Sequence, residues 1–362
     1  MQPSKIFDNE AHEYDALLIV SFGGPEGPDD VMPFLDNVLR GLKVPLPVKA
    51  RIAKRYERFD GISPINRETR SFIEALEIEL QNNGLKLPIY WGNRNWHPML
   101  PDTLRRMADD GIKSAIAYAT STFSSYSGCR KYREDLYEAI QGIDNPPHID
   151  KLRIGYNHPG FIAAVTDRTL EALEHAPTSQ EEVVLIFTAH SLPLSMAQCT
   201  DYEAQLREAC SLVGQAVGIN SWQLAYQSNN ASYGEPWLEP DITDALEKIK
   251  SSGSSKVVIV PIGFVCDHME VVLDLDIEAK EQANSLDLQM VRAGTVGKHP
   301  AYVAMVRDLI IERMSKDPKR QYLGNRGANG DYCTPNCCLS LEDLVTQNLR
   351  SAALETDDRC SS

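Results

Sequence analysis

Two side chains that can bind a metal or move a proton follow predicted buried strands. His190 comes at the end of the apolar run that begins at Val183, and Glu270 follows the β-branched run from Val257 to Val260. Because parallel strands of one sheet end at the same edge, the imidazole and the carboxylate can face each other across one cleft. Such a pair suits a borderline divalent ion such as Fe²⁺, Zn²⁺ or Co²⁺, and it also suits proton abstraction. His190 and Glu270 are therefore the first candidate site.

Two further acids follow Glu270 at a regular interval. Asp274 and Glu278 continue the row in steps of four residues, which places the three carboxylates on one face of a predicted helix. Like charges at this spacing repel each other and slightly destabilise a helix. Two interpretations stay open: a solvated acidic face, or a track of oxygen ligands for a divalent cation. His268 would point off another face of the same helix, so it is a weaker candidate.

Three cysteines form a second cluster near the C-terminus. Cys333, Cys337 and Cys338 follow a glycine-rich and asparagine-rich loop. Four thiolates can hold a [2Fe–2S] cluster or a zinc ion, so a fourth ligand must come from elsewhere. We select Cys129, because its loop at a strand end belongs to the first half, over which a C-terminal tail could fold. Cys360 is the alternative.

The elements that must position these residues alternate along the chain. Short apolar runs, each followed by a helical pattern, predict strands at 16–22, 87–91, 114–120, 152–156, 183–188, 222–227, 257–260 and 288–293. This alternation indicates an α/β fold with parallel sheets. We predict two similar doubly wound, Rossmann-like domains at 1–148 and 149–320. A short cysteine-rich extension, 321–362, carries the clustered thiols.

Composition limits the partners and the compartment. The 36 basic and 51 acidic residues give a net charge of −15, which argues against nucleic acid or an anionic membrane as partner. No apolar run approaches the ~20 residues of a transmembrane helix. The start of the chain lacks the pattern of a signal peptide, so we expect a cytoplasmic protein.

A basic segment between Arg40 and Arg58 stands out on this acidic chain. It includes Arg55, which is followed by Tyr56. The segment is either a solvated helix face or an anchor for an anionic ligand, because a guanidinium group can pair bidentately with carboxylate or phosphate.

Four motifs in chain order resemble the ferrochelatases, enzymes that insert Fe²⁺ into a porphyrin during haem synthesis. The motifs are Ser21-Phe22-Gly23-Gly24-Pro25-Glu26, Gly61-Ile62-Ser63-Pro64, Thr188-Ala189-His190-Ser191-Leu192-Pro193 and Pro261-Ile262-Gly263-Phe264-Val265-Cys266-Asp267-His268-Met269-Glu270. The cysteine tail resembles ferrochelatases that carry a [2Fe–2S] cluster, notably the actinobacterial type. Those are similar to enzymes of the coproporphyrin branch, whose substrate is coproporphyrin III.

The resemblance implies a role for each candidate residue. His190 and Glu270 would face each other across the porphyrin and take the metal and the pyrrole protons. Asp274 and Glu278 match outer acidic positions that guide or hold a second, hydrated cation. The positions that contact the tetrapyrrole and its propionates are matched by Arg55, Tyr56, Ser63 and Tyr132, with Tyr126 as the competitor for Tyr132.

The sequence also departs from some relatives at two of these places. Phe22 stands where some carry a tyrosine that can ligate iron, so that ligation should be absent here. Leu39 stands where some have a propionate-binding arginine, which Arg40 could replace.

The resemblance implies a lyase that forms nitrogen–metal bonds, converting coproporphyrin III and Fe²⁺ into Fe-coproporphyrin III. It also implies a [2Fe–2S] cluster on Cys129, Cys333, Cys337 and Cys338, and hand-over of the product to a downstream enzyme of haem synthesis. Three alternatives stay open: a protoporphyrin IX ferrochelatase, a cobalt or nickel tetrapyrrole chelatase, and a carrier that binds haem or metal without turnover.

Overall fold

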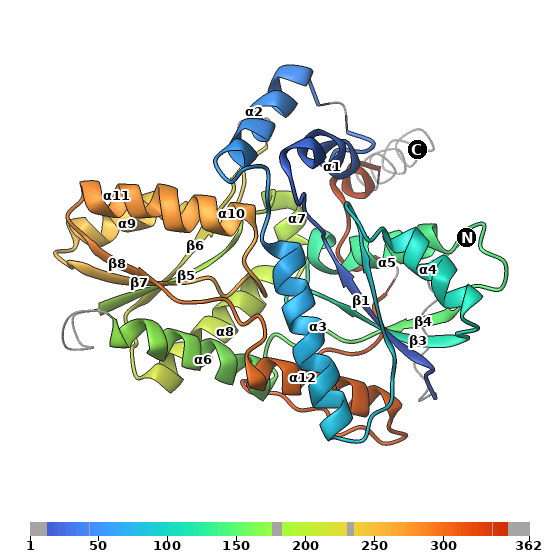
Figure 1. Ribbon diagram of the computed structural model, residues 1–362. Coiled ribbons are helices and arrows are strands. Elements are labelled where there is room, and N and C mark those ends of the chain that lie inside the picture. Colours follow the sequence, from blue (N-terminus) through green and yellow to red (C-terminus); the bar gives the residue numbers. More distant parts are fainter. Residues whose placement is uncertain (1–12, 43, 176–182, 230–234, 335, 347–362) are drawn as a thin grey trace, which may run out of the picture.

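The structure is a computed structural model that describes residues 13–42, 44–175, 183–229, 235–334 and 336–346 (Figure 1). It contains two four-stranded parallel sheets with helices packed on their faces. Among the described residues, no helix combines the length and the apolar character needed to cross a membrane.

The first sheet is built from the N-terminal half in the order β2-β1-β3-β4. Its strands are β1 (Ala16–Ser21), β2 (Ile89–Asn93), β3 (Ser114–Ala119) and β4 (His148–Lys151). The helices of this half are α1 (Val31–Val38), α2 (Leu46–Glu57), α3 (Ile65–Asn82), α4 (Leu100–Asp109) and α5 (Lys131–Ala139). All six residues of β1 are buried, as expected for a central strand covered on both faces.

The second sheet repeats the arrangement in the order β6-β5-β7-β8. Its strands are β5 (Val183–His190), β6 (Trp222–Gln227), β7 (Lys256–Val260) and β8 (Gln289–Arg292). The helices of this half are α6 (Pro159–Glu174), α7 (Leu194–Gln198), α8 (Tyr202–Val217), α9 (Ile242–Ser251), α10 (Met269–Val271), α11 (Lys280–Ser285) and α12 (Pro300–Met314). The α/β class, the parallel sheets and the doubly wound pattern agree with the sequence-based prediction.

One predicted strand is wrong. Residues 152–156 form no strand, and the residues just before them form β4, which pairs with β3 in the first sheet. The apolar residues Leu152, Ile154 and Tyr156 are buried because they enter the core between the two halves. We therefore propose a domain boundary after Lys151, three residues later than the predicted division.

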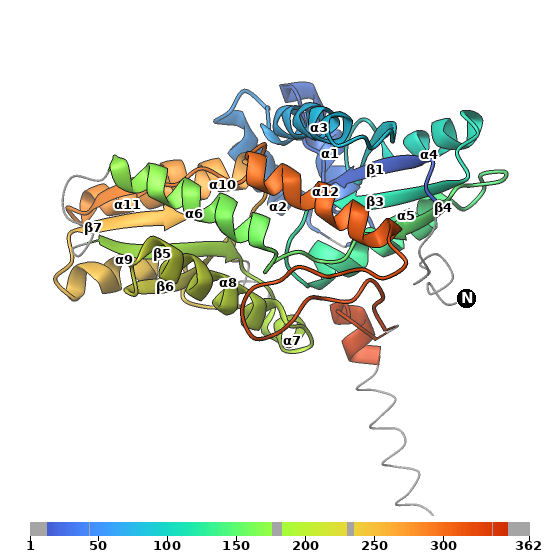
Figure 2. The ribbon, with the colours of Figure 1, turned by 90° about the horizontal axis from the view of Figure 1, so that it is seen from below.

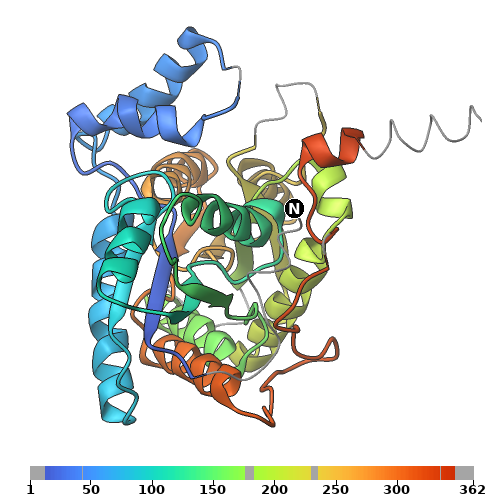
Figure 3. The same cartoon turned by 90° about the vertical axis from the view of Figure 1, so that its right-hand side faces the viewer.

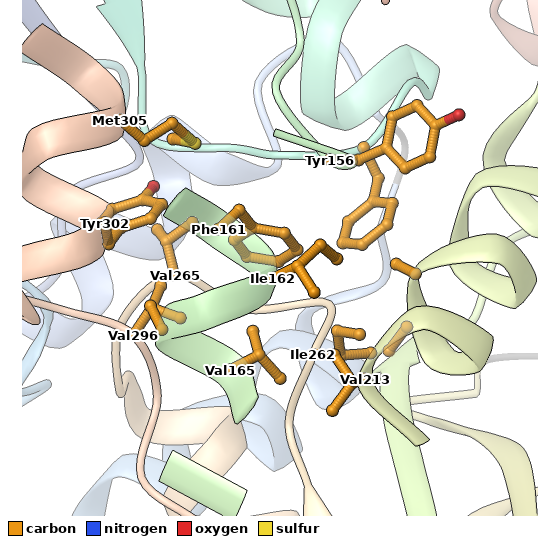
Figure 4. Packing of buried hydrophobic residues seen from close by; sticks show 14 of the residues in the cluster. Tyr156, Phe161, Ile162, Val165, Val213, Ile262, Val265, Val296, Tyr302 and Met305 are labelled. Atoms are coloured by element: carbon orange, nitrogen blue, oxygen red, sulfur yellow. The ribbon is translucent and has the colours of Figure 1, made fainter. Parts of the chain in front are cut away.

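A single core joins the two halves. It includes Ile19 on β1, Phe187 on β5 and Tyr302 on α12, all nearly inaccessible to solvent. Figure 4 shows Phe161, Tyr302 and Met305 in this cluster. Helix α12 lies across the junction and packs against both α3 and α6 (Figure 2). Burial of this shared apolar surface holds the two sheets together and so keeps the residues between them in place.

Helices α1 and α2 form a separate cap, which stands out from the body in Figure 3. Its apolar side, including Phe34 and Tyr56, packs against Met269 on α10 and against Leu273. The cap thus contacts the helix that carries Glu270, although it comes from the other half of the chain.

Candidate active site

His190 is the last residue of β5, and its side chain lies between the two halves of the chain. Its Nδ1 lies 2.5 Å from the carbonyl oxygen of Ser191. Because a carbonyl can only accept, this contact assigns the proton to Nδ1 and leaves a lone pair on Nε2. The Tyr202 hydroxyl donates to the His190 carbonyl at 3.0 Å and holds the strand end in place. The histidine is thus set up to act through Nε2.

Glu270 lies on α10, which follows the neighbouring strand β7. The distance from His190 Nε2 to Glu270 Oε2 is 3.9 Å, and each side chain is 36% exposed. This separation exceeds a direct hydrogen bond, so both groups remain free to contact a third species between them. The backbone N–H of Met269 donates to Ser63 Oγ at 3.3 Å, which ties the start of α10 to the N-terminal half.

His190 and Glu270 both line a cavity of about 430 Å³ between the two halves. Its walls include Phe22, Phe34, Leu39 and Phe264 as apolar residues. The volume lies within the range of small-molecule sites, ~300–1,000 Å³. The cavity thus combines apolar walls with an imidazole and a carboxylate, which suits an apolar ligand that must meet a metal or lose protons.

The predicted tetrapyrrole contacts fall in two groups. Tyr56, Ser63 and Tyr132 line the cavity. Arg55, within the described part of the chain, is not among the lining residues and pairs with Asp274 instead. The competitor Tyr126 turns away, and its hydroxyl donates to Glu134 at 3.1 Å.

The two positions that depart from some relatives both lie at the cavity. Phe22 and Leu39 both line it. Arg40 is exposed, and its Nη2 donates to Asn37 Oδ1 at 2.7 Å. In this structure Arg40 therefore binds its own helix end.

The acidic row does not keep the single face predicted for it. The helix widens into a π-helix over Val272–Ala279, between α10 and α11. π-Helical turns have i to i+5 hydrogen bonds and are frequent at functional sites. Asp274 is only 4% exposed, whereas Glu278 is exposed. The wider turn rotates the side chains relative to an α-helix, so the three acids have three different surroundings.

Asp274 is held by three donors. Arg55 Nη2 lies 2.8 Å from Oδ1, and Gln227 Nε2 lies 3.3 Å from Oδ2, which also accepts from Ser228. Burial raises the pKa of Asp274 to about 6, and Glu270 adds to the rise, against the lowering by Ser228 and Arg55. Because the pKa in the folded state lies above the ordinary 3.8, Asp274 contributes stability that is lost as the pH rises through about 6.

Two further residues line the cavity: sequence reasoning missed Arg94 and ranked His268 as a weaker candidate. Arg94 lines it and pairs with Asp135, and its guanidinium lies 4.7 Å from the Tyr132 ring centroid and 5.6 Å from that of Phe22. His268 also lines it, and burial lowers its pKa, so its neutral form is favoured. The only signal for Arg94 was its place in a polar and aromatic run after a strand.

The cysteines lie where the C-terminal tail meets the first half, since Arg130 and Arg133 donate to the carbonyls of Cys337 and Cys333. Cys129 is buried in a short π-helical turn, Tyr126–Arg130, whose Gly128 lines the cavity. A hydrogen bond with Cys333 and then burial raise the pKa of Cys129 well above its ordinary value. The tail thus brings Cys333 to Cys129.

The remaining thiols continue this group. Cys337 Sγ lies 3.4 Å from Cys338 Sγ. A hydrogen bond with Cys333 lowers the pKa of Cys337, but Cys338 and burial raise it to about 11. Although neighbouring thiols are in contact, no three His, Cys, Asp or Glu side chains in the described residues converge closely enough to hold one metal ion. Contacts in pairs suit a binuclear cluster, because each iron of a [2Fe–2S] cluster takes two protein ligands. Cys360 lies outside the described residues.

Comparison with known proteins places the chain in a family. The family model described as "Ferrochelatase" matches residues 14–314. The "Ferrochelatase" of Rhodopirellula baltica is 47% identical over 333 residues, covering 91% of this chain and 95% of its own. The "Coproporphyrin III ferrochelatase" of Streptomyces coelicolor is 43% identical over 353 residues, covering 91% and 94%.

A solved structure shares the fold at low identity. "SirB from Bacillus subtilis with Fe3+" has a TM-score of 0.54 at 11% identity, over 82% of this chain and 96% of that one. The sequence matches span both sheets, the cavity and the His190–Glu270 pair. The chain belongs to the ferrochelatase family.

Proposed function

We propose that this enzyme inserts Fe²⁺ into coproporphyrin III during haem biosynthesis. The observation that carries the proposal is the His190–Glu270 pair, separated by 3.9 Å in the lining of a cavity of about 430 Å³. The name of the Streptomyces coelicolor relative supports coproporphyrin III as the substrate. A cytoplasmic location and hand-over of the product to a later enzyme of haem synthesis belong to the same proposal.

The reaction replaces two pyrrole protons by one Fe²⁺ ion. In our proposal His190 Nε2 accepts a pyrrole proton, since the Nδ1 proton is already engaged with Ser191. Glu270 offers an oxygen ligand to the incoming ion, stabilises the imidazolium that forms beside it, and then accepts the second pyrrole proton, so that both protons leave the macrocycle as Fe²⁺ enters. Tyr56 and Tyr132 would hold the macrocycle in the cavity. Binding a bent porphyrin exposes its nitrogens, and strain of this kind is worth about 1–5 kcal/mol.

An anaerobic assay tests the function directly. We expect the free-base absorption bands of coproporphyrin III to disappear when Fe²⁺ and the protein are both present, faster than those of protoporphyrin IX. Faster turnover of protoporphyrin IX would contradict the substrate, and preference for Co²⁺ or Ni²⁺ would indicate another chelatase. Binding of porphyrin without any insertion would favour a carrier.

The Arg55–Asp274 pair leads to a prediction about metal uptake. At pH 8, well above the pKa of about 6 of Asp274, Arg55→Met should release the ionised Asp274 for a cation and lower the Fe²⁺ concentration needed for half-maximal rate, whereas Asp274→Asn should raise it. A partly exposed ion pair is worth about 0.2–1 kcal/mol, so each change should be up to about fivefold. Initial rates across a range of Fe²⁺ concentrations give the concentration for half-maximal rate in each variant. Arg58→Met is the control, because Arg58 is on the same cap and its nitrogen lies 3.8 Å from Glu281. Changes in the same direction for both variants would contradict a cation-binding role for Asp274.

We further propose that Cys129, Cys333, Cys337 and Cys338 hold a [2Fe–2S] cluster, which would supply a one-electron redox centre. The four thiols support this by their contacts in pairs. Cys333→Ser should lower iron and sulfide content and, if the cluster is structural, the thermal stability. Absorption spectra of the protein purified without oxygen measure the cluster content, and thermal unfolding measures the stability. Full stability without a cluster would contradict a structural role.

A further inference from the structure

Two basic side chains beside the cysteines lack a carboxylate partner among the described residues. Lys151, at the end of β4, is only 7% exposed, and its Nζ donates to the carbonyl of Leu152 at 3.0 Å. Arg133, on α5, donates through Nη1 to the carbonyl of Cys333 at 3.5 Å, and its buried Nε has no hydrogen-bond partner. Buried charges are normally paired, so this arrangement calls for an anion.

Both cations lie near the thiol group. Arg133 contacts the carbonyl of Cys333, and Lys151 and Arg133 are both close enough to Cys129 to act on it as positive charges. Arg130 also reaches the group and donates to the carbonyl of Cys337 at 3.3 Å, but it already pairs with Glu134 and Asp343. The unmatched positive charge near the cysteines therefore comes from Lys151 and Arg133.

We propose that Lys151 and Arg133 are the counter-charges of the cluster and raise its reduction potential. This inference rests on the cluster proposed above. Four thiolates around an oxidised [2Fe–2S] core carry a net charge of minus two, which two cations balance. One-electron reduction adds a further negative charge without forming or breaking a bond, so nearby cations favour the reduced form. The free Arg133 N–H can donate to a cluster sulfur, which shifts the potential in the same direction.

The test compares neutral and conservative variants by redox titration with dithionite, followed by electron paramagnetic resonance. Lys151→Met and Arg133→Met should each lower the reduced-to-oxidised ratio at a given potential by about tenfold, a shift of about 59 mV to more negative values. Lys151→Arg should restore most of the shift. Lys256→Met is the matched control, because Lys256 is a similarly buried lysine on a strand, β7, in the other sheet.

The outcomes separate this inference from the one on which it rests. Wild-type protein without iron and sulfide would contradict the cluster itself. A cluster whose potential is the same in wild type and in both Met variants would overturn the counter-charge role alone. If a Met variant folds, as judged by circular dichroism, but loses its cluster while Lys151→Arg keeps it, the charge requirement is supported. Equal loss in Lys151→Arg would contradict it.

Discussion

Replacing Glu270 by Gln is expected to lower the rate constant of iron insertion by about 10²–10⁴ while porphyrin binding persists. Gln has nearly the same shape but accepts no proton at neutral pH and is a poorer ligand for a divalent ion. The cavity walls that would hold the macrocycle, such as Tyr56 and Tyr132, are unchanged. Single-turnover absorbance measures insertion, and quenching of porphyrin fluorescence measures binding.

Two comparisons sharpen this result. Glu278→Gln is the control, because Glu278 is exposed on the same helical segment and should affect mainly the dependence on Fe²⁺ concentration. His190→Ala should lose about as much activity as Glu270→Gln, and the double variant little more, since residues that act as a unit are not additive. If the Glu270, Asp274 and Glu278 variants all behave alike, the division between inner and outer acids is wrong.

Replacing Glu312 by Gln should destabilise the fold by about 3–5 kcal/mol, because it leaves Arg153 as a buried charge without its carboxylate. Arg153 Nε and Nη2 donate to the Glu312 carboxylate at 2.6 and 2.9 Å. The Arg153 side chain is 1% exposed and the Glu312 side chain 7%. The same guanidinium donates to the carbonyl of Gln321 at 3.0 Å. The pair thus joins the segment after β4 to α12 and to the start of the tail.

The midpoint of chemical denaturation checks this expectation. Glu203→Gln is the control, because Glu203 forms an ion pair with Arg207 on the exposed face of α8, and such pairs contribute about 0–1 kcal/mol. A shift no larger than that of the control would show that Arg153 finds another partner and that the buried pair is not a main source of stability.

Local sequence patterns were enough to predict the main elements and the central pair of residues. A buried strand is apolar along its length and stops where polar residues begin, so β5 and β7 could be located within one or two residues. Parallel pairing then brings their carboxyl ends together, and His190 lies near Glu270 for this reason. The same patterns did not separate the strand predicted at 152–156 from the buried segment that joins the halves, since both are apolar.

The row of Glu270, Asp274 and Glu278 shows what only the tertiary structure decided. Its spacing determined that three carboxylates follow β7, but not that the helix widens, that Asp274 turns inward, or that Arg55 from 219 residues away meets it. The nearness of Lys151 and Arg133 to the cysteines could likewise not be predicted from the sequence. Contacts between distant residues depend on how the elements pack, which a local pattern does not encode. The sequence by itself therefore determined the fold class and the His190–Glu270 pair, and packing decided the charges around them.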